Sequence, residues 1–195
     1  PSITATTAVA DTVTLTTQDA ETIGASVSDS ANASFATAFQ NAANTDRNYG
    51  ADGAGSTVIS GYTLNVVGLS AEVTSVNSGL DSNGLDVMLT KDQNGDVVGS
   101  TSAGEVFRIS VATNGTVTLT QSAELDHVGN GNGSQIALGT SLVTLSATAT
   151  VTDGDNDTAT ANYSLDLGGN IRFDDDVPSI TATTAVADTV TLTTQ

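Results

Sequence analysis

The chain has 195 residues and carries 22 Asp and Glu against 4 Lys and Arg, which gives a net charge of −18 at pH 7. So strong a negative charge disfavours nucleic acid and anionic membranes as partners, because their phosphates repel it. The hydrophobic fraction of 38% argues for a folded β protein over an acidic disordered tail, and the absence of cysteine leaves a bound metal as the candidate staple for the fold.

The first 18 residues of the chain occur twice. Residues 1–18 and 178–195 both read PSITATTAVADTVTLTTQ, so Pro178 repeats Pro1 and the period is 177 residues. This repetition predicts a tandem array, in which 1–177 is one repeat and 178–195 begins the next or packs back as part of a split domain. Apolar residues alternate with small polar ones in the repeated stretch and predict one or two strands: Ile3, Ala5, Thr7, Val9, Val13 and Leu15.

A polar region over 18–46 follows, and it carries no firm motif. The segment 30–40 is compatible with either a short helix or an irregular sheet edge. Asp19 and Glu21 lie in this region, but no pattern around them assigns them as ligands.

A glycine-rich loop over 48–56 then leads into a strand marked by Val58, Tyr62 and Leu64. A phosphate-binding loop would need a Gly-Lys-Ser/Thr ending and a following helix, and the sequence has neither. Two interpretations remain open. The glycines either form a turn that needs positive φ, or the loop binds a cation through Asp52 and nearby carbonyl groups.

The middle of the chain has three Asn-Gly pairs, Asn83-Gly84, Asn94-Gly95 and Asn114-Gly115, which are the preferred residues of type I′ hairpin turns. Asp92 and Asp96 flank the second pair, and we expect them to be solvated turn acids rather than metal ligands.

His127 is the only histidine and follows Asp126, which raises the question of catalysis. There is no Gly-x-Ser-x-Gly motif, no cysteine nucleophile and no second histidine at metal-ligand spacing. We therefore expect a loop or strand-end residue without a catalytic or metal-binding role.

The clearest pattern lies between Val143 and Leu167, where two runs of alternating apolar residues predict paired strands with a tight connection. That connection is Asp153-Gly154-Asp155-Asn156-Asp157. A D-x-D-x-D run can present three carboxylates to one point, as the hard oxygen ligands of Ca²⁺ do. The flanking strands exclude an EF-hand, and the alternative is a soluble acidic turn whose close carboxylates are left uncompensated.

The second copy of the repeated stretch is preceded by Asp174, Asp175, Asp176 and Val177, so the joint between repeats reads DDDVP. Adjacent carboxylates repel by about 1 kcal/mol per close pair even in water. The joint is therefore either loose and solvated or held by a cation.

Five segments in this order resemble the extender repeats of giant bacterial RTX adhesins, which are exported by type I secretion: NYGADGAGS (48–56), EVFRISV (105–111), LDH (125–127), TDGDNDTATA (152–161) and DDDVP (174–178). The match covers about 49–178. The resemblance implies a β-sandwich repeat on the cell surface that acts as a calcium-binding spacer in adhesion and biofilm formation. By analogy, the calcium ligands are Asp52, Asp153, Asp155, Asp157, Asp174, Asp175 and Asp176.

The sequence thus predicts an all-β, antiparallel, immunoglobulin-like or cadherin-like sandwich repeat. In such a sandwich the 153–157 loop lies at the same end as the N-terminus and faces the incoming joint. A period of 177 residues is large for one sandwich, so a second small or split subdomain stays open.

We expect an extracellular, monomeric spacer that contacts neighbouring repeats, inserts no segment into a membrane and has no enzymatic activity. A glycan- or ligand-binding lobe is the first alternative, although the chain has no Trp and few other aromatic residues to form sugar platforms. A glycoside hydrolase with two catalytic carboxylates is the second alternative.

Overall fold

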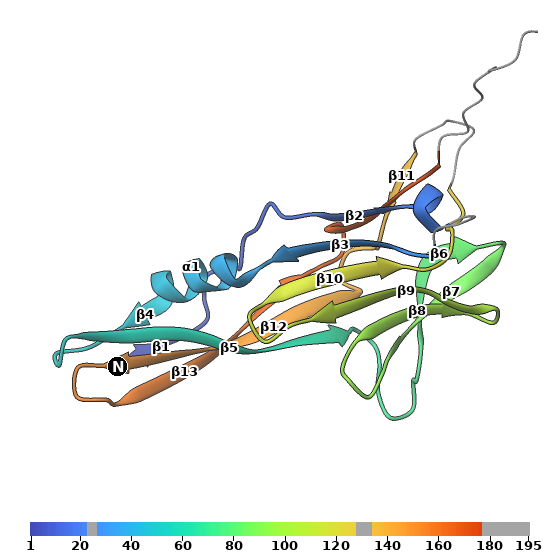
Figure 1. Cartoon of the computed structure of the whole chain (residues 1–195). Helices are drawn as coiled ribbons and strands as arrows, with labels where there is room; N and C mark the ends of the chain where they lie inside the picture. Colours follow the sequence, from blue (N-terminus) through green and yellow to red (C-terminus); the bar gives the residue numbers. More distant parts are fainter. Residues whose placement is uncertain (23–26, 128–133, 177–195) are drawn as a thin grey trace, which may run out of the picture.

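The structure is a computed structural model that describes residues 1–22, 27–127 and 134–176. It confirms the predicted all-β sandwich, with a single α-helix in the described part of the chain (Figure 1). The predictions for the second copy, 178–195, fall outside the described residues.

The strands of the first half are β1 (Ser2–Ile3), β2 (Leu15–Gln18), β3 (Asp29–Ser34), β4 (Arg47–Asn48), β5 (Ala54–Val66), β6 (Val76–Ser82) and β7 (Leu85–Lys91). Those of the second half are β8 (Val97–Thr101), β9 (Gly104–Val111), β10 (Thr116–Gln121), β11 (Gln135–Ala137), β12 (Val143–Asp153), β13 (Thr158–Asp166) and β14 (Ile171–Asp174).

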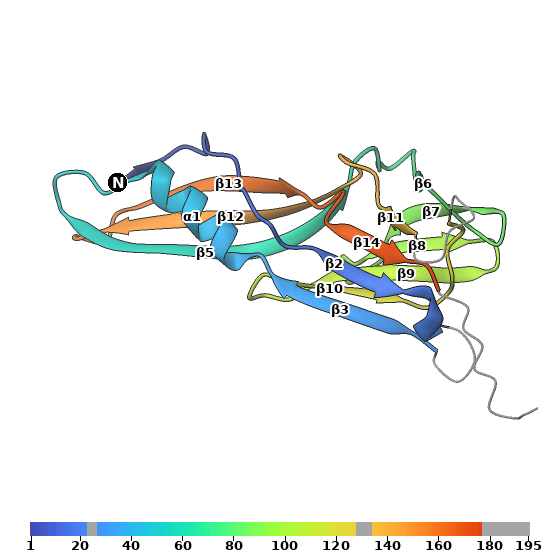
Figure 2. The same ribbon diagram turned by 90° about the horizontal axis from the view of Figure 1, so that it is seen from above.

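The described strands form four sheets. A six-stranded sheet has the order β3-β10-β9-β8-β7-β6, and two three-stranded sheets have the orders β11-β14-β2 and β13-β12-β5, while β1 pairs with β4. The pairs are antiparallel except for β14 and β2, which run parallel. Seen from above, the β11-β14-β2 sheet lies beside the six-stranded sheet at one end of an elongated molecule, and β5, β12 and β13 extend to the other end (Figure 2).

The core joins the sheets through alternating apolar side chains. The rings of Phe107 in β9 and Phe173 in β14 are both fully buried, and their centroids lie 5.1 Å apart across the sandwich. The predicted alternation from Val143 to Leu167 is confirmed, because every second residue of β12 is buried while its neighbours are half-buried. β12 pairs with both β5 and β13 and is therefore the central strand of its sheet.

The ambiguous segment 30–40 contains the end of a strand and the start of a helix. β3 pairs with β10, and α1 (Ala36–Asp46) follows and lies along β5 in both views (Figures 1 and 2). Phe35, Phe39, Ala42 and Ala43 are buried at the i, i+4, i+7 and i+8 positions of one helical face. Two phenylalanines at this spacing are the signal that decides for a helix.

Only one of the three Asn-Gly turns has the predicted type I′ geometry. In Asn83-Gly84 both residues have positive φ, 51° and 72°. In Asn94-Gly95 and Asn114-Gly115 only the glycine has positive φ, and its amide donates to the carbonyl three residues earlier. These two are type I turns followed by a left-handed glycine, so the prediction was wrong for them. The longer connection explains the difference, because the asparagine then occupies a right-handed position.

The first copy of the repeated stretch is integrated into the body. Asp46, the last residue of α1, accepts hydrogen bonds from the backbone N–H and the hydroxyl of both Thr6 and Thr7, at 2.7–2.9 Å. Its Oδ2 also accepts from the Tyr163 hydroxyl of β13 at 2.8 Å. These bonds, led by the one from the Thr7 amide, hold the pKa of the Asp46 carboxyl well below its usual value. One ionised carboxylate thus connects the N-terminal stretch, α1 and β13.

We expect Asp46→Asn to lower the free energy of unfolding at neutral pH, because the amide NH₂ would face the donors of Thr6 and Thr7. A depressed folded-state pKa contributes stability above the unfolded value of about 3.9, and this contribution is lost as the pH falls toward the folded value. The stability gap between wild type and Asp46→Asn should therefore be constant above about pH 5 and shrink below about pH 4. Urea unfolding at several pH values measures the gap. A gap that is the same at pH 3 and pH 7 would contradict the assignment.

Candidate metal centres

The first cluster of carboxylates lies at the end of the molecule that contains Pro1, which we call the N-terminal pole (Figure 1). It is formed by Pro1, the β4–β5 loop and the β12–β13 loop. One carboxylate oxygen from each of Asp52, Asp153 and Asp155 lies within 4.8 Å of the others. The sequence places these acids on two loops a hundred residues apart, and the pairing of β5 with β12 brings the loops together.

Two glycines allow the loops to approach this closely. The register of β5 and β12 shifts between Thr152 and Asp153, which leaves Gly55 as the extra residue of a β-bulge. A Cβ atom on Gly55 would lie 2.3 Å from the Thr152 carbonyl oxygen, and one on Gly154 would lie 2.2 Å from the Asp52 carbonyl oxygen. Any other residue at either position would push the loops apart, so the glycines determine the distance between the acids.

The environment of the three carboxylates differs. Asp153 is 3% exposed, whereas Asp52 and Asp155 are exposed. Burial opposes ionisation of Asp153, but hydrogen bonding with Asp155, the Pro1 ammonium and the Asp157 amide holds the pKa of Asp153 below its usual value. The hydrogen bond with Asp153 and the charge of that residue raise the pKa of Asp155. Two carboxylates this close favour either a shared proton or a cation between them.

Asp153 has one buried oxygen that accepts no hydrogen bond from the described residues. The Pro1 ammonium nitrogen is 3.1 Å from Asp153 Oδ2, and the described residues offer this buried oxygen no other partner. In the second copy of the stretch, the nitrogen of Pro178 is a tertiary amide, which has neither charge nor hydrogen. A repeat inside an array therefore has no charge at this nitrogen to pair with Asp153 Oδ2. The position of Pro1 also confirms that the 153–157 loop lies at the N-terminal end.

A second hairpin shows that the turn geometry alone does not make a site. The 92–96 and 153–157 turns have the same two hydrogen bonds between their first and last aspartates. The amide of the first aspartate donates to the backbone carbonyl of the last, and the amide of the last aspartate donates to Oδ1 of the first. Arg108 bonds to Asp92 at 2.6 Å and to Asp96 at 3.1 Å, and its bond holds the pKa of Asp92 below its usual value. These acids are neutralised by a side chain, in accord with the non-metal interpretation.

Asp157, the third acid of the D-x-D-x-D run, contributes to the N-terminal pole mainly through its backbone. Its amide donates to Asp153 Oδ1 at 2.9 Å, and its carboxylate is not among the three that converge. Asn156, with a φ of 73°, makes the turn that produces this arrangement. Of the predicted loop ligands, the structure therefore brings together Asp52, Asp153 and Asp155.

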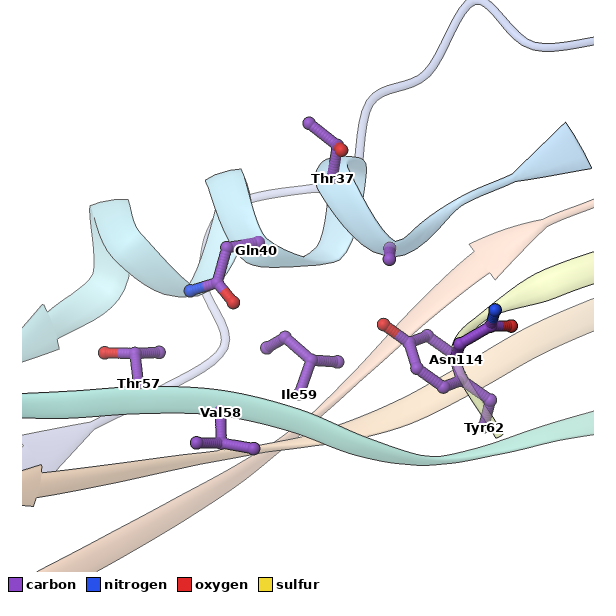
Figure 3. Close-up of a pocket in the computed structure, with 8 residues that line it drawn as sticks. Thr37, Gln40, Thr57, Val58, Ile59, Tyr62 and Asn114 are labelled. Carbon is purple, nitrogen blue, oxygen red and sulfur yellow. The ribbon is translucent and has the colours of Figure 1, made fainter. Parts of the chain in front are cut away.

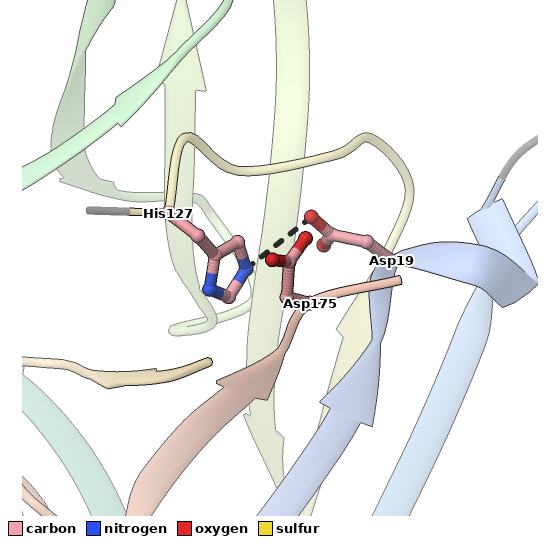
Figure 4. A group of neighbouring side chains, drawn as sticks. All are labelled: Asp19, His127 and Asp175. Atoms are coloured by element: carbon pink, nitrogen blue, oxygen red, sulfur yellow. Dashed lines mark ion pairs between the residues drawn. The ribbon is translucent and has the colours of Figure 1, made fainter. Parts of the chain in front are cut away.

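A second cluster consists of Asp19, His127 and Asp175 (Figure 4). It lies where β2 and β14 end, at the end of the molecule opposite Pro1, which we call the C-terminal pole (Figures 1 and 2). β2 and β14 are parallel and in register, with Gln18 beside Asp174. Asp19 and Asp175, the residues that follow this pair, therefore lie side by side. His127 reaches them from the segment after β10, and its Nε2 is 3.3 Å from Asp19 Oδ2.

The second cluster is largely buried, with Asp175 half-buried. The side chains of His127 and Asp19 are 3% and 4% exposed, and neither ring nitrogen of His127 has a hydrogen-bond partner among the described residues. Gln121 Nε2 donates to Asp19 Oδ1, and the Leu125 amide donates to its Oδ2 at 3.2 Å. Burial raises the pKa of Asp19, although both hydrogen bonds oppose this effect. His127 does lie in a loop, as predicted, but its buried side chain faces two acids that no local sequence motif connects to it.

Asp174 and Asp175, the first two acids of the joint, have different partners. Asp174 accepts a hydrogen bond from Gln135 at 2.6 Å, and Asp175 turns toward the second cluster and accepts from Ser134 at 3.2 Å. Asp176 is the last described residue of the joint. Within the described residues, the triplet therefore contributes one member, Asp175, to a group of acids that could hold a metal ion.

An open pocket of about 450 Å³ lies between α1 and β5 (Figure 3). Gln40 and Thr37 line it from the helix, and Val58 and Tyr62 line it from the strand. Tyr62 is the only aromatic residue that lines this pocket. Its ring packs edge-on against Phe39, with the ring centroids 5.6 Å apart. Gly115 also lies close to the ring, because a Cβ atom on this glycine would be 2.7 Å from it. Because Tyr62 is engaged in packing, the pocket gives no specific support to glycan binding.

The described helices include none that is long and apolar enough to span a membrane. No curated protein and no solved structure matches the chain significantly. A family model matches residues 6–168, which is most of one period and includes every residue of the first cluster. The chain therefore belongs to the family described as Domain of unknown function (DUF5801).

Proposed function

We propose that this chain is a calcium-stiffened spacer, an extender repeat of a bacterial cell-surface adhesin exported by type I secretion. The observation that carries the proposal is the convergence of Asp52, Asp153 and Asp155, with a buried Asp153 oxygen that accepts no hydrogen bond from the described residues, at the pole where the acidic joint of a preceding repeat would arrive. A cation at this position would offset carboxylates from two repeats at once. It would thereby fix the angle between them.

The donor atoms at the N-terminal pole favour calcium. Asp52, Asp153 and Asp155 supply carboxylate oxygens, and the Asp52 carbonyl lies against the 153–157 loop. Ca²⁺ takes six to eight oxygen ligands, so three residues leave room for the joint acids of a neighbour and for water. Among the described residues, no histidine belongs to this cluster.

The shape of the repeat suits a spacer. The N-terminal pole and the C-terminal pole lie at opposite ends of the elongated molecule (Figures 1 and 2). An array would therefore add length with each repeat, and its partners would be the neighbouring repeats of the same chain. In this proposal the role is structural and extracellular, and it requires no catalytic group.

We expect Asp155→Asn to weaken Ca²⁺ binding by on the order of tenfold or more, because loss of a direct ligand should cost at least as much as loss of an outer-shell partner. Asp86→Asn, in the exposed part of β7, removes the same charge away from the site and should leave binding unchanged. Calorimetric titration of both variants measures the difference. Equal titrations would mean that the cluster is a solvated acidic turn.

Extending the chain before Pro1 tests whether the joint shares the cation. The test compares an Asp-Asp-Asp-Val extension with a Ser-Ser-Ser-Val extension of the same length. In Ca²⁺ only the acidic extension should gain the full linkage stabilisation, about 2.7 kcal/mol at 100 times the dissociation constant. This corresponds to roughly 5–10 °C for a chain of this size. Identical calcium responses of the two extensions would show that the joint acids are not ligands.

The decisive experiment concerns stiffness. Small-angle scattering on four or more tandem repeats should give a long maximum dimension in Ca²⁺ and a shorter one in EDTA, while circular dichroism retains the strand signal. The matched control is the same array with Asp155→Asn in every repeat, which should be compact in both conditions. Wild-type arrays with the same dimension in Ca²⁺ and EDTA would refute the calcium-stiffened spacer.

A further inference from the structure

We propose that Asp19, His127 and Asp175 form a second metal site at the C-terminal pole, which takes a divalent transition-metal cation of the Zn²⁺ class rather than calcium. The inference does not rest on the proposed spacer function. It rests on a separate set of side chains, at the other end of the repeat.

The chemistry of the donors points to this class of metal. One imidazole nitrogen and two carboxylate oxygens lie within 4.8 Å of one another, each from a different segment of the chain. Imidazole together with carboxylate suits Zn²⁺ and related cations, whereas Ca²⁺ prefers oxygen ligands alone. Three protein ligands leave a fourth position of a tetrahedral site open to water.

The burial of His127 is the independent observation that a ligand belongs here. Its side chain is 3% exposed. Nδ1 has no partner in the described part of the chain, and Nε2 lies 3.3 Å from Asp19 Oδ2 without forming a hydrogen bond. A buried polar group without a partner is costly and rare in folded proteins. Nε2 points between the two carboxylates, and Figure 4 shows the three side chains directed toward one another. A cation at this point would give the ring nitrogen its missing partner.

The two carboxylates are already held in place. Gln121 and Leu125 donate hydrogen bonds to the Asp19 carboxylate. The Ser134 hydroxyl donates to the Asp175 carboxylate, and the Ser134 backbone carbonyl accepts a hydrogen bond from the Asp175 amide at 2.9 Å. Hydrogen bonds of this kind orient the carboxylate ligands of metal sites. The three ligand atoms therefore need to move only a short distance toward one another to bind a cation.

The consequence concerns the segment that leaves the repeat. Asp175 directly follows β14 and is the middle acid of the joint. A metal bound here would attach the joint to the body of its own repeat, whereas the proposed calcium at the N-terminal pole joins one repeat to the next. The two ions would hold the two sides of the same joint.

The test uses Zn²⁺ on the whole chain in excess Ca²⁺, so that oxygen-only sites are already filled. We expect calorimetry to show one equivalent of Zn²⁺, with affinity reduced on the order of 100-fold in His127→Gln. Asp155→Asn, which alters the other cluster, should bind Zn²⁺ like the wild type. Zn²⁺ binding that is equal in wild type and in folded His127→Gln would overturn the proposal.

A second readout does not depend on any variant folding. His127 is the only histidine, so the imidazole resonances in a ¹⁵N NMR spectrum belong to it alone. One equivalent of Zn²⁺ should shift the Nε2 resonance, and Co²⁺ should give a visible absorption band that Zn²⁺ displaces. Unchanged ring resonances would mean that the cluster is an ion pair without metal, and the same shift with Ca²⁺ alone would mean a calcium site. Either result refutes the proposal and leaves the calcium result at the N-terminal pole unaffected.

Discussion

The crowding of carboxylates with few positive charges is the physical constraint on which the rest of this structure depends. The chain has 22 acids and 4 basic side chains. In the described residues, Arg108 is the only Lys or Arg side chain that forms ion pairs, and it serves three acids around one hairpin. Arg47 and Arg172 bond to neutral groups. Where the fold brings further acids together, at the two poles, no described Lys or Arg side chain pairs with them, and His127 is the one side chain there that can carry a positive charge.

The contrast between the two acidic hairpins shows how context gives a turn its chemistry. The 92–96 and 153–157 turns share the same backbone bonds, and both begin and end with aspartate. The first lies opposite Arg108 and becomes a salt-bridged surface feature. The second lies against the Asp52 loop, where a third carboxylate replaces the guanidinium. The neighbouring strand, rather than the turn, therefore decides which acids are available to a cation.

Much of the fold could be predicted because it follows from local alternation. Strands β12 and β13 and the hairpin of β9 and β10 lie where period-2 patterns indicated, and Asp153 and Asp155 could be chosen because they are neighbours in sequence. The prediction left segment 30–40 open because only Phe35 and Phe39 mark the helical face strongly, and the two alanines that complete this face give a weak signal.

The second cluster could not be found from the sequence, because its members come together only through the parallel pairing of β2 and β14. A lone histidine has no local partner that would identify its role. The register of the two strands, once known, places Asp19 beside Asp175 without any further information. Long-range strand pairing is the kind of knowledge that a single sequence does not contain.

The parallel pairing of β2 and β14 also has a mechanical consequence. The chain enters at the N-terminal pole, reaches β2 after docking along α1, and leaves at the C-terminal pole directly from β14. Tension between the two ends therefore pulls β2 and β14 in opposite directions along their common axis, from Ile171 beside Leu15 to Asp174 beside Gln18. Such a pair is loaded in shear, and its hydrogen bonds share the force and must break together instead of opening one at a time.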